Sequence, residues 1–139
     1  MILHPFDSID PMRLKILAVT LLLLPFYLAA PIQAENPQHI TQLLETRECR
    51  RCDLKRANLR DNDLRFTDLR DTDLREADLR GSDLREADLR RADLTEANLR
   101  GADLRNTYLR FTNLTDTNLK RANLCGATMP DGSISEQGC

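Results

Sequence analysis

The sequence predicts an all-β solenoid, a chain wound into stacked coils, and three regular features of residues 52–129 predict it. First, leucine recurs at every fifth position, and Met129 takes the last place in the series. Second, the residue two places before each of these positions is small, with Asn62 as the one exception, and it is Ala eight times and Thr five times. Third, the residue just before is Asp nine times and Asn five times, and the residue just after is Arg ten times and Lys twice. The leucines are Leu54, Leu59, Leu64, Leu69, Leu74, Leu79, Leu84, Leu89, Leu94, Leu99, Leu104, Leu109, Leu114, Leu119 and Leu124.

A period of five residues fits neither an α-helix nor a straight β-strand. Five residues turn an α-helix through about 500°, so the leucines would drift around the cylinder and form no stripe. On a straight strand, five steps would send alternate leucines to opposite faces. A chain that bends once in every repeat points every leucine and small residue inward, and the charged residues outward. Gly81, Gly101 and Gly126 fall at the bends, where tolerance of positive φ is useful.

Residues 1–34 are typical of a secretory signal peptide. A basic start at Met12 precedes an uncharged stretch from Ile16 to Ala30, and a small residue stands at Ala34. The stretch is shorter than the ~20 apolar residues of a spanning helix. We expect cleavage after Ala34 and no stable membrane anchor after cleavage, with Met12 as a candidate for the true start. An uncleaved membrane anchor is the alternative interpretation.

Both ends of the repeat array carry capping signals. In segment 35–51, Asn36 and Pro37 are suited to the N-cap and the first position of a short capping α-helix. Three apolar residues then fall on one face of that helix: Ile40, Leu43 and Leu44. In the C-terminal tail, residues 130–139, a Pro-Asp-Gly-Ser turn leads back toward the final residue.

The repeats resemble those of the pentapeptide-repeat family. The pattern Ala-(Asp/Asn)-Leu-x-x is seen in Ala77-Asp78-Leu79-Arg80-Gly81 and in Ala102-Asp103-Leu104, and it covers residues 52–129. The resemblance implies a right-handed quadrilateral β-helix with four repeats per coil, hence about four coils stacked on one another. The signal peptide, the cysteines and the segment that follows Cys125 resemble those of exported family members of cyanobacterial type. That similarity implies a location in the periplasm or thylakoid lumen.

Four cysteines remain in the exported chain, where an oxidising compartment lets disulfides persist. Cys49 and Cys52 form a C-x-x-C, and Cys52 occupies an inward position of the first repeat. We expect disulfides Cys49–Cys52 and Cys125–Cys139, although four cysteines allow three pairings. A redox-active C-x-x-C, or a metal site shared with His39, is the alternative use of the first pair.

The charged columns have a structural explanation. Residues 52–129 carry equal numbers of basic and acidic residues, so arginine columns flanked by aspartates are expected to neutralise each other. The arginine columns are Arg60/Arg80/Arg100, Arg65/Arg85/Arg105 and Arg70/Arg90/Arg110. We therefore expect no nucleic-acid partner. The family includes proteins that protect DNA gyrase by imitating DNA, but this chain lacks the continuous acidic face that such mimicry needs.

Four residues depart from the repeat pattern. Phe66, Tyr108 and Phe111 are apolar at outward positions of one wall, and we interpret them as a candidate contact with a protein partner. Asn62 takes an inward small position, where a hydrogen bond to the backbone is the ordinary explanation. The predicted function is therefore an exported, non-catalytic structural scaffold or protein-interaction module, with neither cofactor nor metal. The alternatives are a thiol-redox-responsive protein and a gyrase-protecting DNA mimic. The identity of the partner and the oligomeric state stay open.

Overall fold

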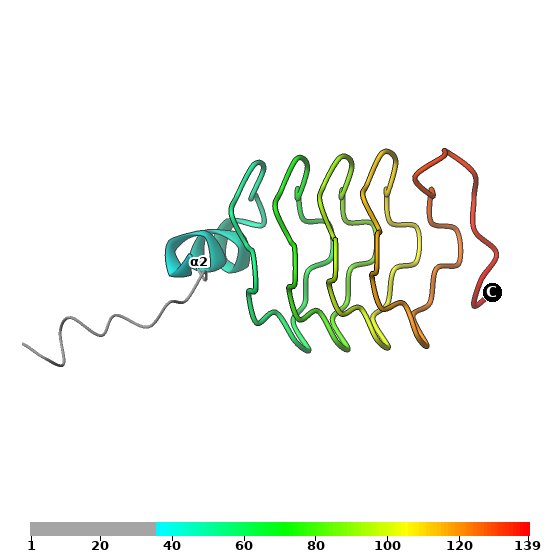
Figure 1. The fold of residues 1–139 in the computed structure, drawn as a ribbon, viewed down its shortest axis with the longest axis horizontal. Helices are drawn as coiled ribbons and strands as arrows, with labels where there is room; N and C mark the ends of the chain where they lie inside the picture. Colours follow the sequence, from blue (N-terminus) through cyan, green and yellow to red (C-terminus); the bar gives the residue numbers. More distant parts are fainter. Residues whose placement is uncertain (1–35) are drawn as a thin grey trace, which may run out of the picture. The chain divides into compact units, whose positions relative to one another are not determined.

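The computed structural model describes residues 36–139, which form one helix followed by a stack of four-sided coils (Figure 1). The segment interpreted as a signal peptide, with Met12 and Ala34, lies outside the described residues. Residues 36–139 contain no helix with the length and apolarity that crossing a membrane requires.

Helix α2 (Pro37–Thr46) begins and ends with side-chain and backbone caps. The Asn36 side chain accepts a hydrogen bond from the backbone N–H of His39 at 3.4 Å, and Pro37 supplies the first helical residue. Arg47 ends the helix in the left-handed conformation at φ 60°, where its N–H donates to the Leu43 carbonyl at 3.0 Å. These bonds satisfy backbone groups that a short helix would otherwise leave unpaired.

The helix covers the first coil with a narrower face than the sequence suggested. Leu43 is fully buried in the core and Ile40 packs partly against it. Leu44, which we expected on the same face, is 46% exposed. Adjacent helical residues point about 100° apart, and the helix is rotated so that Leu43 faces the coil while Leu44 lies at the edge of the covered face.

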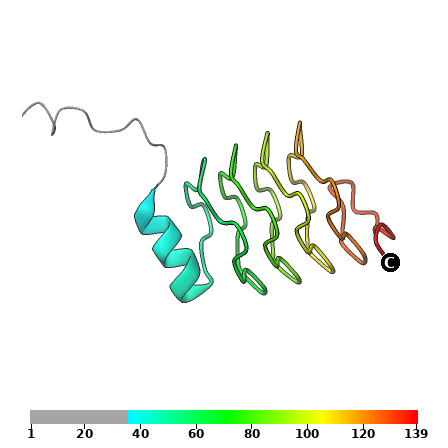
Figure 2. The ribbon, with the colours of Figure 1, turned by 90° about the horizontal axis from the view of Figure 1, so that it is seen from below.

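The coils are joined by single parallel bridges between residues that are twenty apart. The series runs from Glu48–Asp68 to Tyr108–Thr128. At the first bridge the Cys49 N–H donates to the next coil, and at the later bridges a leucine N–H does so, as from Leu54 to the Asp73 carbonyl at 2.8 Å. Each straight segment is therefore only a few residues long, and the chain turns between them (Figure 2). We name the four walls by their first leucine: wall 1 by Leu54, wall 2 by Leu59, wall 3 by Leu64 and wall 4 by Leu69.

The corners explain why the repeat is five residues long. At the first one, the N–H of Ala57 donates to the Leu54 carbonyl at 3.0 Å and closes a four-residue turn. Its third residue, Arg56, has φ 60°, and the other corners have positive φ as well. Positive φ at the third position is characteristic of type II turns. Most corners use a residue other than glycine, so the fold holds many side-chain-bearing residues in a conformation that they rarely adopt.

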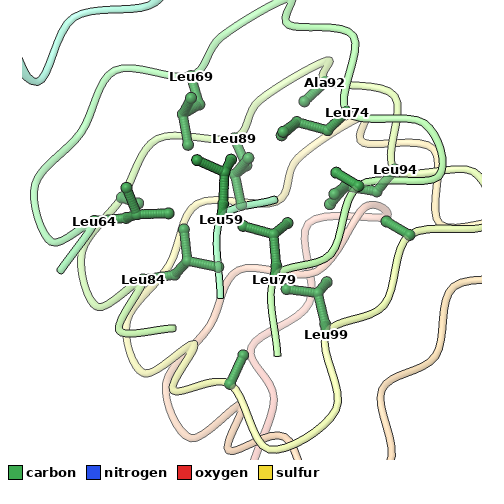
Figure 3. Close-up of a cluster of buried hydrophobic side chains, with 14 of the residues drawn as sticks. Leu59, Leu64, Leu69, Leu74, Leu79, Leu84, Leu89, Ala92, Leu94 and Leu99 are labelled. Carbon is green, nitrogen blue, oxygen red and sulfur yellow. The ribbon is translucent and has the colours of Figure 1, made fainter. Parts of the chain in front are cut away.

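The leucines of the four walls meet along the axis of the coil and fill it (Figure 3). Those from Leu54 to Leu109 are at most 1% exposed. In the last coil, Leu114, Leu119 and Met129 are only partly buried, whereas the sequence led us to expect every one of them inside. The tail explains the exposure of Leu114 and Leu119, because it pairs with the last coil at Leu124, Gly126 and Met129, on walls 3 and 4 alone. Met129 is only partly buried although the tail pairs with its backbone.

Inward polar side chains bond to the coil backbone. The hydroxyl of Thr72 donates to the Cys49 carbonyl at 2.7 Å, and that of Thr107 donates to the Leu84 carbonyl at 2.8 Å. Asn62 donates to the Arg60 carbonyl at 3.0 Å from a partly exposed position. Within the described part of the chain, every buried side-chain nitrogen and oxygen has a hydrogen-bond partner.

Candidate functional site

The C-x-x-C lies at the junction between α2 and the first coil. Cys49 and Cys52 are joined at an S–S distance of 2.05 Å, and both side chains are buried. His39 lies nearby, but its Nδ1 accepts a hydrogen bond from the backbone N–H of Asp53 at 3.0 Å. Among residues 36–139 no group of three metal-ligating side chains gathers here or elsewhere. This end of the molecule is thus built to hold the helix on the coil.

The second cysteine pair ties down the tail. Cys125 and Cys139 are joined at 2.03 Å across a sequence separation of 14. The segment between them folds back in antiparallel fashion: Ile134 bridges Thr128, and the Ser135 N–H donates to the Ala127 carbonyl at 2.9 Å. The described residues contain no free cysteine.

Wall 3 carries the self-neutralising ladder that the sequence indicated. Asp83 accepts a hydrogen bond from Nε of Arg85 at 2.8 Å and lies 3.7 Å from Nε of Arg65 in the preceding coil. The hydrogen bonds from the Arg85 guanidinium hold the pKa of the Asp83 carboxyl below its ordinary value, against a smaller opposing effect of desolvation. Asp83 therefore stays ionised between two arginines.

On wall 2 the arginine column is not fully neutralised by aspartates, contrary to what the sequence led us to expect. Asn98 accepts a hydrogen bond from the backbone N–H of Arg100 at 3.2 Å, which is the same bond that Asp83 accepts from Arg85 on wall 3. An asparagine therefore preserves the turn but removes the negative charge. Arg60 and Arg100, each preceded two residues earlier by asparagine, make no ion pair with the carboxylates of residues 36–139. Self-neutralisation is consequently a property of individual walls.

Wall 4 begins as a ladder and then changes. Arg70 pairs with Asp68 in its own repeat and lies 3.6 Å from Asp88 in the next coil. Arg90 pairs with Asp88 at 2.5 Å. In the third coil Tyr108 takes the place of the aspartate, and Arg110 has no ion pair with any carboxylate of the described residues.

A shallow hollow of about 200 Å³ opens on this part of wall 4. Its lining consists of four arginines and one aromatic residue: Arg70, Arg90, Arg91, Arg110 and Phe111. The Arg110 guanidinium carbon lies 5.0 Å from the centroid of the Phe111 ring, within the range of a cation–π contact.

The three outward aromatic residues do not form one patch. Phe111 (66% exposed) lines the hollow, and Tyr108 (49% exposed) belongs to the same repeat. Phe66 is 62% exposed but lies in the first coil, at the opposite corner of the wall, and it does not line the hollow. In the sequence alone, Arg110 is one member of the column Arg70/Arg90/Arg110. The signal that could have singled it out is the tyrosine standing where its aspartate would be.

A four-sided coil with a leucine-filled interior and charged outer walls defines a repeat scaffold whose exposed chemistry lies on its surface. The sequence profile of pentapeptide repeats (8 copies) matches residues 52–91, 72–110 and 92–131, which together cover more than half of the chain. The chain therefore belongs to the pentapeptide-repeat family, whose fold is the right-handed quadrilateral β-helix. No catalytic family is indicated.

Solved structures of pentapeptide-repeat proteins resemble this chain. It is 39% identical to the pentapeptide-repeat protein alr5209 of Nostoc PCC 7120, with a TM-score of 0.62 over 68% of this chain and 81% of that one. HetL of Nostoc, described as involved in the regulation of heterocyst differentiation, is 34% identical over 63% of this chain and 51% of its own, with a TM-score of 0.36. A protein of the Arabidopsis thaliana thylakoid lumen is 37% identical over 58% and 61% of the two chains, with a TM-score of 0.28. Among curated protein sequences there is no significant match.

Proposed function

We propose that this protein is an exported, non-catalytic scaffold that binds a protein partner through wall 4. The observation that carries the proposal is the interruption of the wall 4 ladder in the third coil. There Tyr108 and Phe111 expose aromatic surface beside Arg110, which has no carboxylate partner among residues 36–139. Aromatic residues and arginine are the residue types enriched at protein interfaces.

The interior of the solenoid supports a surface role. Leucines, alanines and threonines fill the axis of the coil, and their side chains are buried from the first coil through the third. A close-packed interior of this kind leaves no room for a substrate or cofactor. What the described part of the protein presents to other molecules is its outer walls and its two ends.

Export is proposed from the sequence and from the cysteines. The basic start at Met12, the uncharged stretch after it and the small residue Ala34 are arranged as in a signal peptide. The two disulfides of the folded part would persist in an oxidising compartment. A periplasmic or thylakoid-lumen location satisfies both requirements.

The two alternative functions receive less support. Cys49 and Cys52 are buried beneath α2, whereas redox-active cysteines are accessible to their reaction partners. A DNA mimic needs a continuous negative wall, but on wall 2 three asparagines are each followed by a cation that has no ion pair within residues 36–139. The scaffold remains the function that the geometry supports best.

The matched pair Phe111→Ser and Phe66→Ser tests the proposal. Both residues are exposed phenylalanines at corners, so each change removes a similar apolar area without touching the core. Crosslinking in the native compartment, followed by mass spectrometry, is expected to lose its main crosslinked protein in Phe111→Ser and to keep it in Phe66→Ser. An identical set of crosslinked proteins in both variants and in the wild type would contradict the assignment of wall 4.

A further inference from the structure

On wall 4, the third coil lacks a carboxylate that would pair with two arginines, one in its own repeat and one in the coil before it. In the first two coils, Asp88 serves both Arg90 in its own repeat and Arg70 in the coil before it. By the same geometry, a carboxylate at position 108 would serve Arg110 and Arg90. Tyr108 stands there instead, bridged in parallel to Asp88. Arg90 therefore keeps one carboxylate, and Arg110 has none among the described residues.

The surroundings hold Arg110 beside the hollow without neutralising it. Its guanidinium stacks on Phe111, and on the tail side it approaches Gly132, where an added Cβ would lie 3.5 Å from Nη1. Asp131 is the acidic residue of the adjoining turn, but it accepts hydrogen bonds from the N–H and the hydroxyl of Ser133 at 2.9 and 2.7 Å. The tail therefore lies against Arg110 but supplies no carboxylate that pairs with it.

The other arginines of the hollow are only partly compensated. Arg70 and Arg90 share Asp68 and Asp88, and Nε of Arg91 donates to Asp71 at 2.7 Å. The four arginines that line the hollow of about 200 Å³ therefore have three carboxylates as ion-pair partners in all. The unbalanced charge is positive, and it lies where several planar N–H donors approach one another.

We propose that this hollow binds a small oxyanion, a carboxylate or phosphate group with at least two terminal oxygens. The guanidinium fork matches such a group through paired, charge-assisted hydrogen bonds. One oxygen would be within reach of Arg110 and another of Arg90, inside the hollow that these two arginines line. The site is open to water, so an isolated ion is expected to bind with a dissociation constant on the order of millimolar.

Wall 2 provides the matched comparison. Arg100 occupies the same repeat position as Arg110 and likewise has no carboxylate partner in the described part of the protein. It does not line the hollow, whereas Arg110 does. If anions were attracted to any unpaired arginine, they would bind near Arg100 and Arg110 equally. If the hollow is the binding site, an anion binds near Arg110 and not near Arg100.

The test is a titration of the purified full chain, in separate experiments, with inorganic phosphate and with acetate, at constant ionic strength. The Nε–Hε resonances of the arginines are followed by NMR. We expect saturable shifts at Arg90 and Arg110 and no saturable shift at Arg100. Arg110→Gln is expected to weaken binding by about tenfold, and Arg100→Gln to leave it unchanged, because only the former removes a fork from the site. Saturation by phosphate alone, by acetate alone or by both supports the proposal and identifies the group.

Tyr108→Asp supplies the complementary variant. Aspartate is the usual residue at this repeat position, so the coil is expected to fold, and its carboxylate would pair with Arg90 and Arg110. Binding of both ions should then be lost, and the Arg110 resonance should shift before any ion is added. Unsaturable shifts of equal size at all exposed arginines would overturn the proposal. Unchanged ion affinity in Tyr108→Asp, with the fold intact, would overturn it as well.

Discussion

His39 accepts a hydrogen bond from the backbone N–H of Asp53 at 3.0 Å and thereby joins helix α2 to the first coil. The first coil has no coil before it, so this N–H has no bridge partner of the kind that Asp73 finds in the Cys52 carbonyl. The imidazole takes that carbonyl's place. An α-helix can therefore end a β-helix without leaving this edge group unpaired.

Replacing His39 by alanine tests this cap. His39→Ala is expected to lower the free energy of unfolding by about 1 kcal/mol, because the Asp53 N–H then loses its partner. Gln38→Ala, at the neighbouring exposed position of the same helix, is the control and should change stability by less than about 0.5 kcal/mol. Urea unfolding followed by circular dichroism gives both values. Equal effects of the two changes would show that His39 contributes only helix propensity.

The core predicts a contrast between two leucines of the same repeat position. Leu89 is fully buried between coils, whereas Leu119 in the last coil is partly exposed. Leu89→Ala should cost about 3 kcal/mol because a closed cavity remains, and Leu119→Ala clearly less because water reaches its site. Denaturant midpoints measure the difference. Similar losses for the two variants would mean that another molecule or segment covers the last coil in solution.

The wall 3 ladder predicts a dependence of stability on acid. The pKa of Asp83 is lowered in the folded state, so its contribution is complete above the ordinary carboxyl pKa of about 4 and is lost as the pH falls through the lowered value. Asp83→Asn should therefore be less stable than the wild type, by less than about 1 kcal/mol at pH 7, and the gap should close below pH ~4.

Asp116→Asn is the control for this prediction, since Asp116 is an aspartate that makes no ion pair with the rest of residues 36–139. The difference in the free energy of unfolding between Asp116→Asn and the wild type should not shrink in this way as the pH falls. The measurement is the free energy of unfolding, followed from neutral pH down through the range in which carboxylates titrate. A wild type and an Asp83→Asn variant that run parallel over this whole range would contradict the ladder account.

The tail disulfide predicts a loss of order at one end of the molecule. Replacing both Cys125 and Cys139 by serine removes a bond that closes a loop with a sequence separation of 14. In the chain-entropy account such a loop contributes about 3 kcal/mol. Hydrogen exchange should become faster at Gly126 and Ser135, whose N–H groups pair the tail with the last coil, and stay slow at Leu89. Uniform acceleration in all coils would instead indicate global destabilisation.

Much of the fold follows from one regularity. The five-residue period of Leu54 and its successors excludes a helix and a straight strand, and it places a bend in each repeat. The number of walls came from the resemblance to a family, because the period alone does not fix how many bends close a coil. The exposure of Leu44 and Leu119 could not be predicted, since it depends on how the helix is rotated and on which walls the tail covers.

The surface was less predictable than the core. The sequence pointed to Phe111 and Tyr108, but it treated Phe66 as their equal and Arg110 as one more charge in a balanced column. The difference arises from contacts between neighbouring coils, such as Arg70 with Asp88, which the repeat pattern shows only after the coil length is known. The substitution of asparagine for aspartate at position 98 was visible, but its effect on charge pairing needed the positions of neighbouring coils.

The mass of the endogenous protein, measured with and without reduction and thiol labelling, tests most directly the claim of an exported, disulfide-tied scaffold. We expect a chain that begins at Glu35 and carries no free thiol before reduction. A chain that retains Met1 or Met12 and has four labelled cysteines would contradict export and both disulfides.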